Sequence, residues 1–214
     1  MKLFSYQSRA VRPLWDIFFK SVKEKTSFEF YPQPIPTEFD GANYGEPRYW
    51  KLMRWMGLDK MRLIMDNWGE VITITGCDME FYGDAALDLK ARIKNLDFLT
   101  PENEAGIKTS CGCLQVLRCG HKTHDFYDAV YNNDKIGTVP DDPLIDKYRG
   151  MVSYALLPRE LYWNACGSLW TIGKPIPEPP KTIIWFHGNW CLGLENKVAL
   201  LNGVRAKMRG ETKP

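Results

Sequence analysis

Two segments far apart in the chain carry residues that can bind a metal ion where an apolar run ends. Asp78 and Glu80 follow the apolar stretch 71–77, and His187 closes the stretch 183–187. Alternate side chains of an extended strand point the same way, so both carboxylates can reach one ion. Carboxylate oxygens and an imidazole nitrogen suit Mn²⁺ or Mg²⁺. These three residues predict a metal site, although a solvated strand end and a hydrogen-bonded core histidine are the ordinary alternatives.

Glycine, asparagine and lysine residues follow the histidine. Gly188 and Asn189 come directly after it, and Gly193 and Lys197 lie a few residues further on. Glycine allows a ligand to approach the backbone closely, and a lysine ammonium group neutralises phosphate charge. Together with the metal ligands, this pattern predicts a site for a metal-bridged diphosphate.

The elements that would position these residues alternate between strands and helices. We expect strands over residues 2–6, 28–31, 71–77, 111–118 and 183–187. We expect helices over residues 13–22, 47–56, 59–65, 85–94, 123–131 and 195–207. Such alternation predicts an α/β fold with helices on both faces of a sheet, and ligands of such folds bind beyond the carboxyl ends of the strands.

Composition indicates one enzyme-sized domain. The chain has 214 residues, and we expect a domain over residues 1–207 and a polar tail over 208–214 that links to further C-terminal domains. A net charge of +2 gives no electrostatic reason to expect a nucleic-acid partner. No apolar run approaches the ~20 residues of a membrane span, and no signal peptide is recognisable, so we expect a cytoplasmic protein. The six cysteines are expected to be mostly buried free thiols.

Taken together, these motifs resemble those of the GT-A glycosyltransferases, the nucleotide-diphospho-sugar transferases. The run 78–83 resembles their D-x-D segment, and 187–197 resembles their C-terminal histidine–asparagine–glycine–lysine motif. Residues 4–6 resemble the first strand, 110–118 the strand that begins Asn-Ala-Gly, and 141–146 the stretch beside the donor sugar. The resemblance spans nearly the whole chain in the family's order. It is strongest to chlorovirus glycosyltransferase domains implicated in decorating a major capsid protein.

The resemblance implies a GT-A fold, with a central, mostly parallel mixed sheet flanked by helices. It implies an enzyme that moves a hexose or deoxyhexose, of the glucose or rhamnose class, from a UDP-sugar to a glycan or glycoprotein acceptor. Retention of the anomeric configuration and a role in viral capsid glycosylation are implied as well. The family's metal, Mn²⁺ (or Mg²⁺), would be held by Asp78, Glu80 and His187, with Glu80 replacing the commoner second aspartate.

The resemblance also assigns roles to individual residues. Asp141 and Asp142 would be the catalytic residues that face the transferred sugar, and Tyr6 would pack on the uracil. Ser110 stands where the family usually has asparagine. The implied donor-binding residues are Ser5, Tyr6, Gln7, Lys60, Arg62, Ser110, Asn189, Gly193 and Lys197.

Two other functions fit parts of the sequence. The metal triad would serve equally in a metal-dependent nucleotide-sugar hydrolase or phosphotransferase. Cys111, Cys113, Cys119 and His121 could together hold Zn²⁺ in a zinc-stabilised binding module. The spacing of the first two cysteines within an apolar strand favours buried thiols instead.

Overall fold

The computed structural model describes residues 1–42, 46–102, 109–132, 141–164, 170–188 and 193–211. Its centre is a six-stranded sheet in the order β2-β1-β3-β6-β5-β7. The strands are β1 (Lys2–Gln7), β2 (Glu29–Pro34), β3 (Val71–Thr75), β5 (Phe98–Pro101), β6 (Leu114–Arg118) and β7 (Tyr154–Leu157). Strand β6 is antiparallel to both neighbours, and the other pairings are parallel. The predicted α/β fold with a mostly parallel mixed sheet is confirmed.

A second, three-stranded sheet brings the two predicted metal-binding motifs together. It consists of β4 (Met79–Phe81), β9 (Trp185–His187) and β8 (Tyr162–Asn164), in the order β4-β9-β8. Strands β4 and β9 are antiparallel, and Met79 lies opposite His187. The residues that follow β3 and those that end β9 are therefore neighbours.

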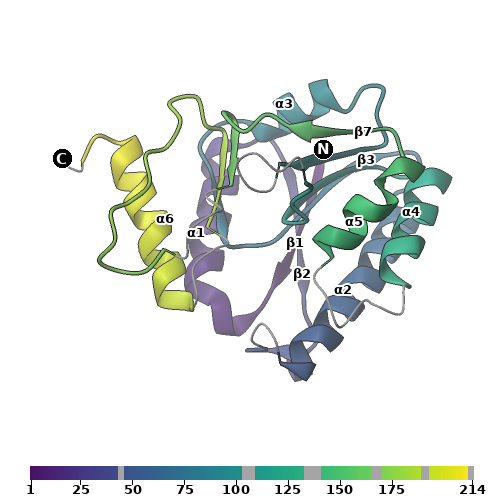
Figure 1. Cartoon of the computed structure of the whole chain (residues 1–214), viewed down its shortest axis with the longest axis horizontal. Coiled ribbons are helices and arrows are strands. Elements are labelled where there is room, and N and C mark those ends of the chain that lie inside the picture. Colours follow the sequence, from purple (N-terminus) through teal and green to yellow (C-terminus); the bar gives the residue numbers. More distant parts are fainter. Residues whose placement is uncertain (43–45, 103–108, 133–140, 165–169, 189–192, 212–214) are drawn as a thin grey trace.

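Helices cover both faces of the large sheet (Figure 1). The α-helices are α1 (Arg12–Lys25), α2 (Pro47–Asp66), α3 (Ala85–Arg92), α4 (His121–Tyr131), α5 (Asp142–Tyr148) and α6 (Leu194–Met208). Short 3₁₀ helices span Arg9–Val11, Thr37–Phe39 and Arg149–Met151. Helices α2, α4 and α5 pack on one face, through Leu63, Phe126 and Ile145. Helices α1 and α3 pack on the other, through Phe18 and Leu89, and α6 lies beside α1.

The structure corrects several predicted boundaries. Residues 47–56 and 59–65 belong to one helix, α2. Asp59 lies inside this helix, where its carboxylate accepts hydrogen bonds from Tyr6 and Arg62, and it does not cap a new helix. Gly57 lies inside α2 and faces Tyr131 on α4. A Cβ at position 57 would come within 2.2 Å of the Tyr131 ring, so the close packing of the two helices requires glycine there.

Three predicted strands are shorter than expected, among them the strand over 183–187, which begins at Trp185. The strand over 71–77 ends at Thr75, and a bend separates it from β4. The strand over 111–118 begins at Leu114. Strands β4, β5, β7 and β8 were not predicted, because runs of three or four residues are too short to show a period.

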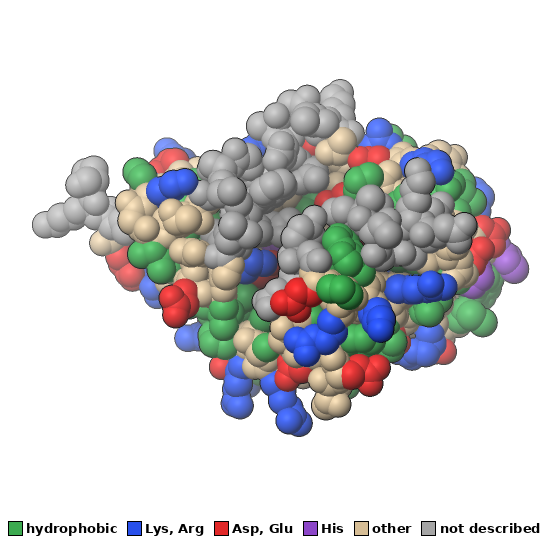
Figure 2. Space-filling view, turned by 60° about the horizontal axis from the view of Figure 1, so that its bottom comes forward, with side chains coloured by type: hydrophobic (Ala, Val, Ile, Leu, Met, Phe, Trp, Pro, Cys, Tyr) green, Lys and Arg blue, Asp and Glu red, His purple; other side chains and the backbone are tan. Residues whose placement is uncertain are grey.

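The surface carries charges of both signs. Figure 2 shows basic and acidic side chains interspersed with apolar ones over one face of the molecule. Among the helices that the structure describes, none is both long enough and apolar enough to cross a membrane.

Candidate active site

The segments that follow β1 and β3 and the segment that precedes β6 meet at one edge of the large sheet. This follows from topology, because parallel strands end at the same edge and the antiparallel β6 begins there. The Ser5 hydroxyl is fully buried and donates a hydrogen bond to the carbonyl oxygen of Gly76, at 3.1 Å. The N–H of Gly76 donates to the carbonyl oxygen of Cys113, at 3.2 Å. Ser5 therefore fixes the turn that precedes the first predicted metal ligand.

Asp78 lies between His187 and Lys197. Nε2 of His187 is 3.1 Å from Oδ1 of Asp78, and Nζ of Lys197 is 2.5 Å from Oδ2. The N–H of Gly188 also donates to the Asp78 carbonyl oxygen, at 3.0 Å, which holds the two motifs in register. Burial by itself raises the pKa of Asp78, but Lys197 and His187 outweigh it and keep the pKa well below its ordinary value. Asp78 is therefore ionised at neutral pH.

The Asp78–His187 pair fits a divalent cation. Adjacent ligands of an octahedral ion with bonds of 2.0–2.1 Å lie roughly 3.0 Å apart. The separation between Oδ1 of Asp78 and Nε2 of His187 is 3.1 Å. One carboxylate oxygen and one imidazole nitrogen are thus already spaced as two neighbouring ligands of Mn²⁺ or Mg²⁺.

Glu80 contacts a different turn of α6. Its carboxylate accepts a hydrogen bond from Nε of Arg205 at 2.7 Å and from the Tyr82 hydroxyl at 3.0 Å. Burial raises the pKa of Glu80, and Arg205 opposes that rise. Among the described residues, Glu80 does not join Asp78 and His187 in a group whose ligand atoms all lie within 4.8 Å of one another. The structure brings together two of the three predicted ligands.

Asp141 belongs to a buried polar network between α2, α4 and α5. Oδ2 of Asp141 accepts a hydrogen bond from the Tyr131 hydroxyl at 2.7 Å, and Nζ of Lys60 lies 3.4 Å away. Lys60 also donates to the Tyr131 hydroxyl, at 2.7 Å. Burial lowers the pKa of Lys60, although Asp141 acts in the opposite direction. Tyr131 was not predicted, because only tertiary packing shows that it lies beside Asp141.

Asp142 holds the turn that precedes β6. Its Oδ1 accepts the N–H of Gly112 at 2.6 Å. A Cβ on Gly112 would lie 2.8 Å from that oxygen and 3.1 Å from Oδ1 of Asp141, so any side chain there would have to displace a carboxylate. Burial, followed by the charge of Asp141, raises the pKa of Asp142 to about 7.

Ser110 is held by α5, the helix that begins at Asp142. Its N–H and hydroxyl donate to Oδ1 of Asp146, at 2.9 and 2.8 Å. Asp146 lies four residues after Asp142, on one face of α5. This spacing was the available signal for Asp146, which was not predicted as a site residue.

The predicted nucleotide residues lie in different environments. The Tyr6 side chain is 6% exposed, its ring packs edge-on to Trp55, and its hydroxyl donates to the Met56 carbonyl oxygen at 3.2 Å. Burial raises the pKa of Tyr6 well above its ordinary value. Gln7 ends β1, and its carbonyl oxygen accepts the N–H of Ile35. In this structure the Tyr6 ring belongs to the core between β1 and α2.

The remaining predicted donor residues are less closely grouped. Arg62 forms ion pairs with Asp59 and Asp66 on the exposed side of α2. Gly193 has a φ of 84° and directly precedes α6, a conformation that glycine adopts without strain. Asn189 lies outside the described residues.

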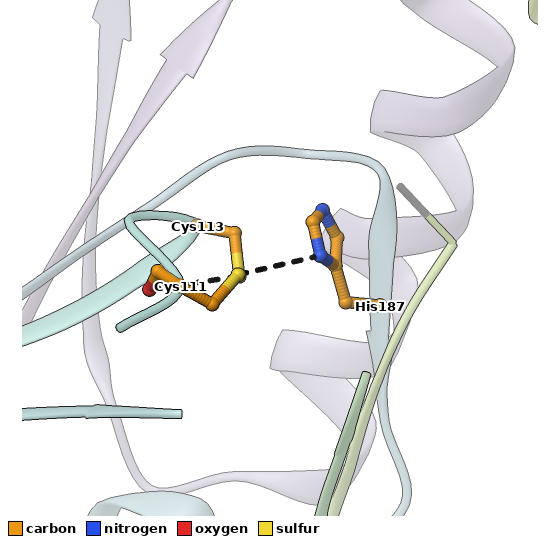
Figure 3. Close-up of side chains that lie close together, drawn as sticks. All are labelled: Cys111, Cys113 and His187. Carbon is orange, nitrogen blue, oxygen red and sulfur yellow. Dashed lines mark hydrogen bonds between the residues drawn. A yellow bond between two sulfur atoms is a disulfide. The ribbon is translucent and has the colours of Figure 1, made fainter. Parts of the chain in front are cut away.

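The cysteines differ from the expectation. Cys111 and Cys113 are disulfide-bonded, whereas Cys77 and Cys119 are free thiols as predicted. The alternative four-residue zinc site is not formed, because β6 separates Cys111 and Cys113 from Cys119 and His121. The cysteine pair instead faces His187 (Figure 3), with 4.0 Å between Sγ of Cys111 and Nδ1 of His187.

Comparison with solved structures gives the fold a family context. No family model and no curated protein sequence matches the chain. A glycosyltransferase involved in glycosylation of the major capsid of PBCV-1 aligns with a TM-score of 0.63 at 10% identity, over 94% of this chain and 98% of that one. Mouse xyloside xylosyltransferase 1, in its apo form, aligns with a TM-score of 0.56 at 8% identity, over 88% of this chain and 97% of that one. The chain has a GT-A fold.

A third similar structure is the glycosyltransferase GlyE of Streptococcus pneumoniae TIGR4. Its TM-score is 0.53 at 11% identity, and the alignment covers 100% of this chain and 65% of GlyE. The similarity to a viral capsid glycosyltransferase agrees with the resemblance found in the sequence motifs, at the level of the fold.

Proposed function

We propose that this protein is a metal-dependent glycosyltransferase that uses a UDP-sugar. It transfers a hexose or deoxyhexose, of the glucose or rhamnose class, to a glycan or glycoprotein acceptor. The observation that carries the proposal is the pairing of Asp78 with His187 beside Lys197, at the edge of a GT-A sheet where ligands bind. The similarity to a glycosyltransferase involved in viral capsid glycosylation supports a capsid protein as the acceptor.

Asp78 and His187 would hold Mn²⁺ or Mg²⁺, and Glu80 would join them only by leaving Arg205. When bound, such an ion acts as a Lewis acid that stabilises the negative charge of a departing nucleoside diphosphate. Lys197 places an ammonium group beside Asp78, where it can neutralise a phosphate oxygen. Because Asp78 is ionised at neutral pH, no proton has to leave it before a cation binds.

The acidic pair provides the sugar side of the proposed site. The turn 111–113 touches His187 through Cys111 and Asp142 through Gly112, so it links the phosphate side to the acidic pair. A carboxylate near the anomeric carbon stabilises the positive charge that develops in an oxocarbenium-like transition state. Lys60 and Tyr131 fix the orientation of Asp141.

The donor base is proposed to lie at the end of β1, near Ser5, Tyr6 and Gln7. Ser110, which contacts Asp146, and Gly193, which directly precedes α6, are proposed to contact the donor as well. We further propose that the anomeric configuration is retained, as the resemblance implies.

A donor screen tests the proposal. UDP release is measured for a panel of UDP-sugars with Mn²⁺, with and without a glycan acceptor, together with the sugar product. We expect turnover that requires both metal and acceptor and that Asp78→Asn abolishes. Asp66→Asn serves as the control, because Asp66 lies on the exposed side of α2 and pairs with Arg62. UDP-sugar cleavage that gives free sugar regardless of acceptor would favour the hydrolase alternative, and no cleavage of any donor would reject the proposal.

A further inference from the structure

Three soft or borderline metal ligands lie together beside the proposed active site. Among the described residues, Cys111, Cys113 and His187 form a group whose ligand atoms all lie within 4.8 Å of one another. Figure 3 shows the imidazole ring of His187 directed at the two sulfur atoms. Cys111 and His187 are buried, with 1% and 2% of their surface exposed. Thiolate sulfur together with imidazole nitrogen is the donor set that selects Zn²⁺ over Mg²⁺ or Mn²⁺.

We propose that, when the disulfide is reduced, Cys111, Cys113 and Nδ1 of His187 bind one Zn²⁺ ion. This site uses the other ring nitrogen from the pair that would hold Mn²⁺ or Mg²⁺, and the two are alternatives, because Nε2 keeps its N–H for Asp78 when Nδ1 binds zinc. It also differs from the four-residue zinc site considered from the sequence, because Cys119 and His121 take no part in it. The inference does not depend on the proposed glycosyltransferase activity.

The observed spacing is close to that of a tetrahedral zinc site. With Zn–S bonds of about 2.3 Å and Zn–N bonds of 2.0–2.1 Å, ligand atoms S and N lie roughly 3.6 Å apart. The distance from Sγ of Cys111 to Nδ1 of His187 is 4.0 Å, so small side-chain rotations are sufficient. Once reduced, the two sulfurs need to separate to roughly 3.8 Å, which the same geometry requires.

Nε2 of His187, the ring nitrogen that faces away from the cysteines, is already placed as in a zinc-binding histidine. A histidine that binds a metal through one nitrogen usually donates the N–H of the other nitrogen to a carboxylate, which fixes the ring orientation. Here Nε2 of His187 lies 3.1 Å from Oδ1 of Asp78. Nζ of Lys197 donates to the other oxygen of that carboxylate, so Asp78 is held in position to orient the ring.

Zinc binding requires that the disulfide is first reduced. A dithiol reductant transfers two electrons and two protons to the Cys111–Cys113 disulfide, and is itself oxidised to a disulfide. Zn²⁺ then displaces the two thiol protons and leaves two thiolate–zinc bonds. Three protein ligands leave the fourth tetrahedral position to water or to an anion.

Cobalt spectroscopy tests the site directly. The full chain is reduced with a phosphine under anaerobic conditions, and Co²⁺ is titrated as a spectroscopic substitute for Zn²⁺. We expect saturation at about one equivalent, with a thiolate-to-cobalt charge-transfer band and the intense visible bands of tetrahedral Co²⁺. Zn²⁺ should displace the cobalt and bleach both sets of bands.

Matched variants locate the ligands. Cys111→Ser and Cys113→Ser should each remove most of the charge-transfer intensity, and Cys119→Ser should keep it, because Cys119 lies at the far end of β6. Circular dichroism of each variant separates loss of a ligand from loss of the fold. The proposal is overturned if the reduced parent shows no charge-transfer band, or if the band survives in a folded Cys111→Ser protein. Mn²⁺ binding by the same cysteine variants is measured by calorimetry and should be retained, because the proposed Mn²⁺ ligands do not include a cysteine.

Discussion

Lys60 and Asp141 form an ion pair inside the protein, with 3.4 Å between Nζ and Oδ2 and side chains only 5% and 11% exposed. Removing one partner of a buried pair leaves an uncompensated charge, which typically costs about 3–5 kcal/mol. We therefore expect Lys60→Met to lower the free energy of unfolding by about that much, as measured by urea denaturation. Lys51→Met, on the exposed surface of α2, is the control and should change stability little.

The double variant Lys60→Met with Asp141→Asn should recover part of the loss, because Asp141 then no longer carries a charge that has lost its partner. If the double variant is instead as unstable as the sum of the single variants, the two charges are not energetically coupled.

Asp78 and Glu80 should differ in their importance for metal binding. Asp78→Asn should abolish calorimetric Mn²⁺ binding in the presence of UDP, because Asp78 is already spaced from His187 as a neighbouring ligand. Glu80→Gln should retain it, because Arg205 and Tyr82 hold that carboxylate. Equal loss in both variants would mean that Glu80 leaves Arg205 to become the third ligand, as the sequence motif implies.

Asp142 should make stability depend on pH. Its pKa is about 7 in the folded protein, against an ordinary value of 3.8, so between these pH values the folded state binds more protons than the unfolded state. The contribution of Asp142 to stability is therefore fully present at low pH and is lost as the pH rises to about 7. Melting temperatures across this range should fall more steeply for the parent than for Asp142→Asn. Parallel pH profiles would show that Asp142 does not titrate in this way.

Gly112 should be intolerant of a side chain. A Cβ there would come within 2.8 Å of Oδ1 of Asp142, so Gly112→Ala should displace the acidic pair and cost about 1–3 kcal/mol. Gly150→Ala is the matched control, because nothing lies within 4 Å of a Cβ at that position. Thermal unfolding and kcat of both variants test this, and an unchanged kcat in Gly112→Ala would remove the acidic pair from the proposed sugar site.

Substitutions of Tyr6 test whether its ring stacks on the uracil base or only packs in the core. If its ring stacks on uracil, Tyr6→Ala should weaken UDP binding roughly ten- to hundredfold, and Tyr6→Phe should leave it unchanged. Tyr6→Phe should still lose about 1 kcal/mol of stability, because the hydroxyl bonds to Met56 and Asp59 disappear. Calorimetry with UDP decides between the two roles. Normal UDP affinity in a folded Tyr6→Ala protein would mean that Tyr6 is only a core residue.

The sequence determined the alternation of strands and helices and the residues that end β3 and β9. Apolar β-branched runs and amphipathic spacing are local properties, so β3 and α1 could be predicted from them. The functional interest of Asp78 and His187 followed from their places at the ends of two such runs.

The partners of these residues depended on the tertiary structure. Asp78 and Glu80 both follow β3, yet one meets Lys197 and the other Arg205, because α6 presents different turns to β4. The position of the Cys111–Cys113 disulfide beside His187 arises from the approach of the turn before β6 to the small sheet. No local period encodes such contacts: Cys111 and His187, for example, lie 76 positions apart and meet only when the two sheets have formed.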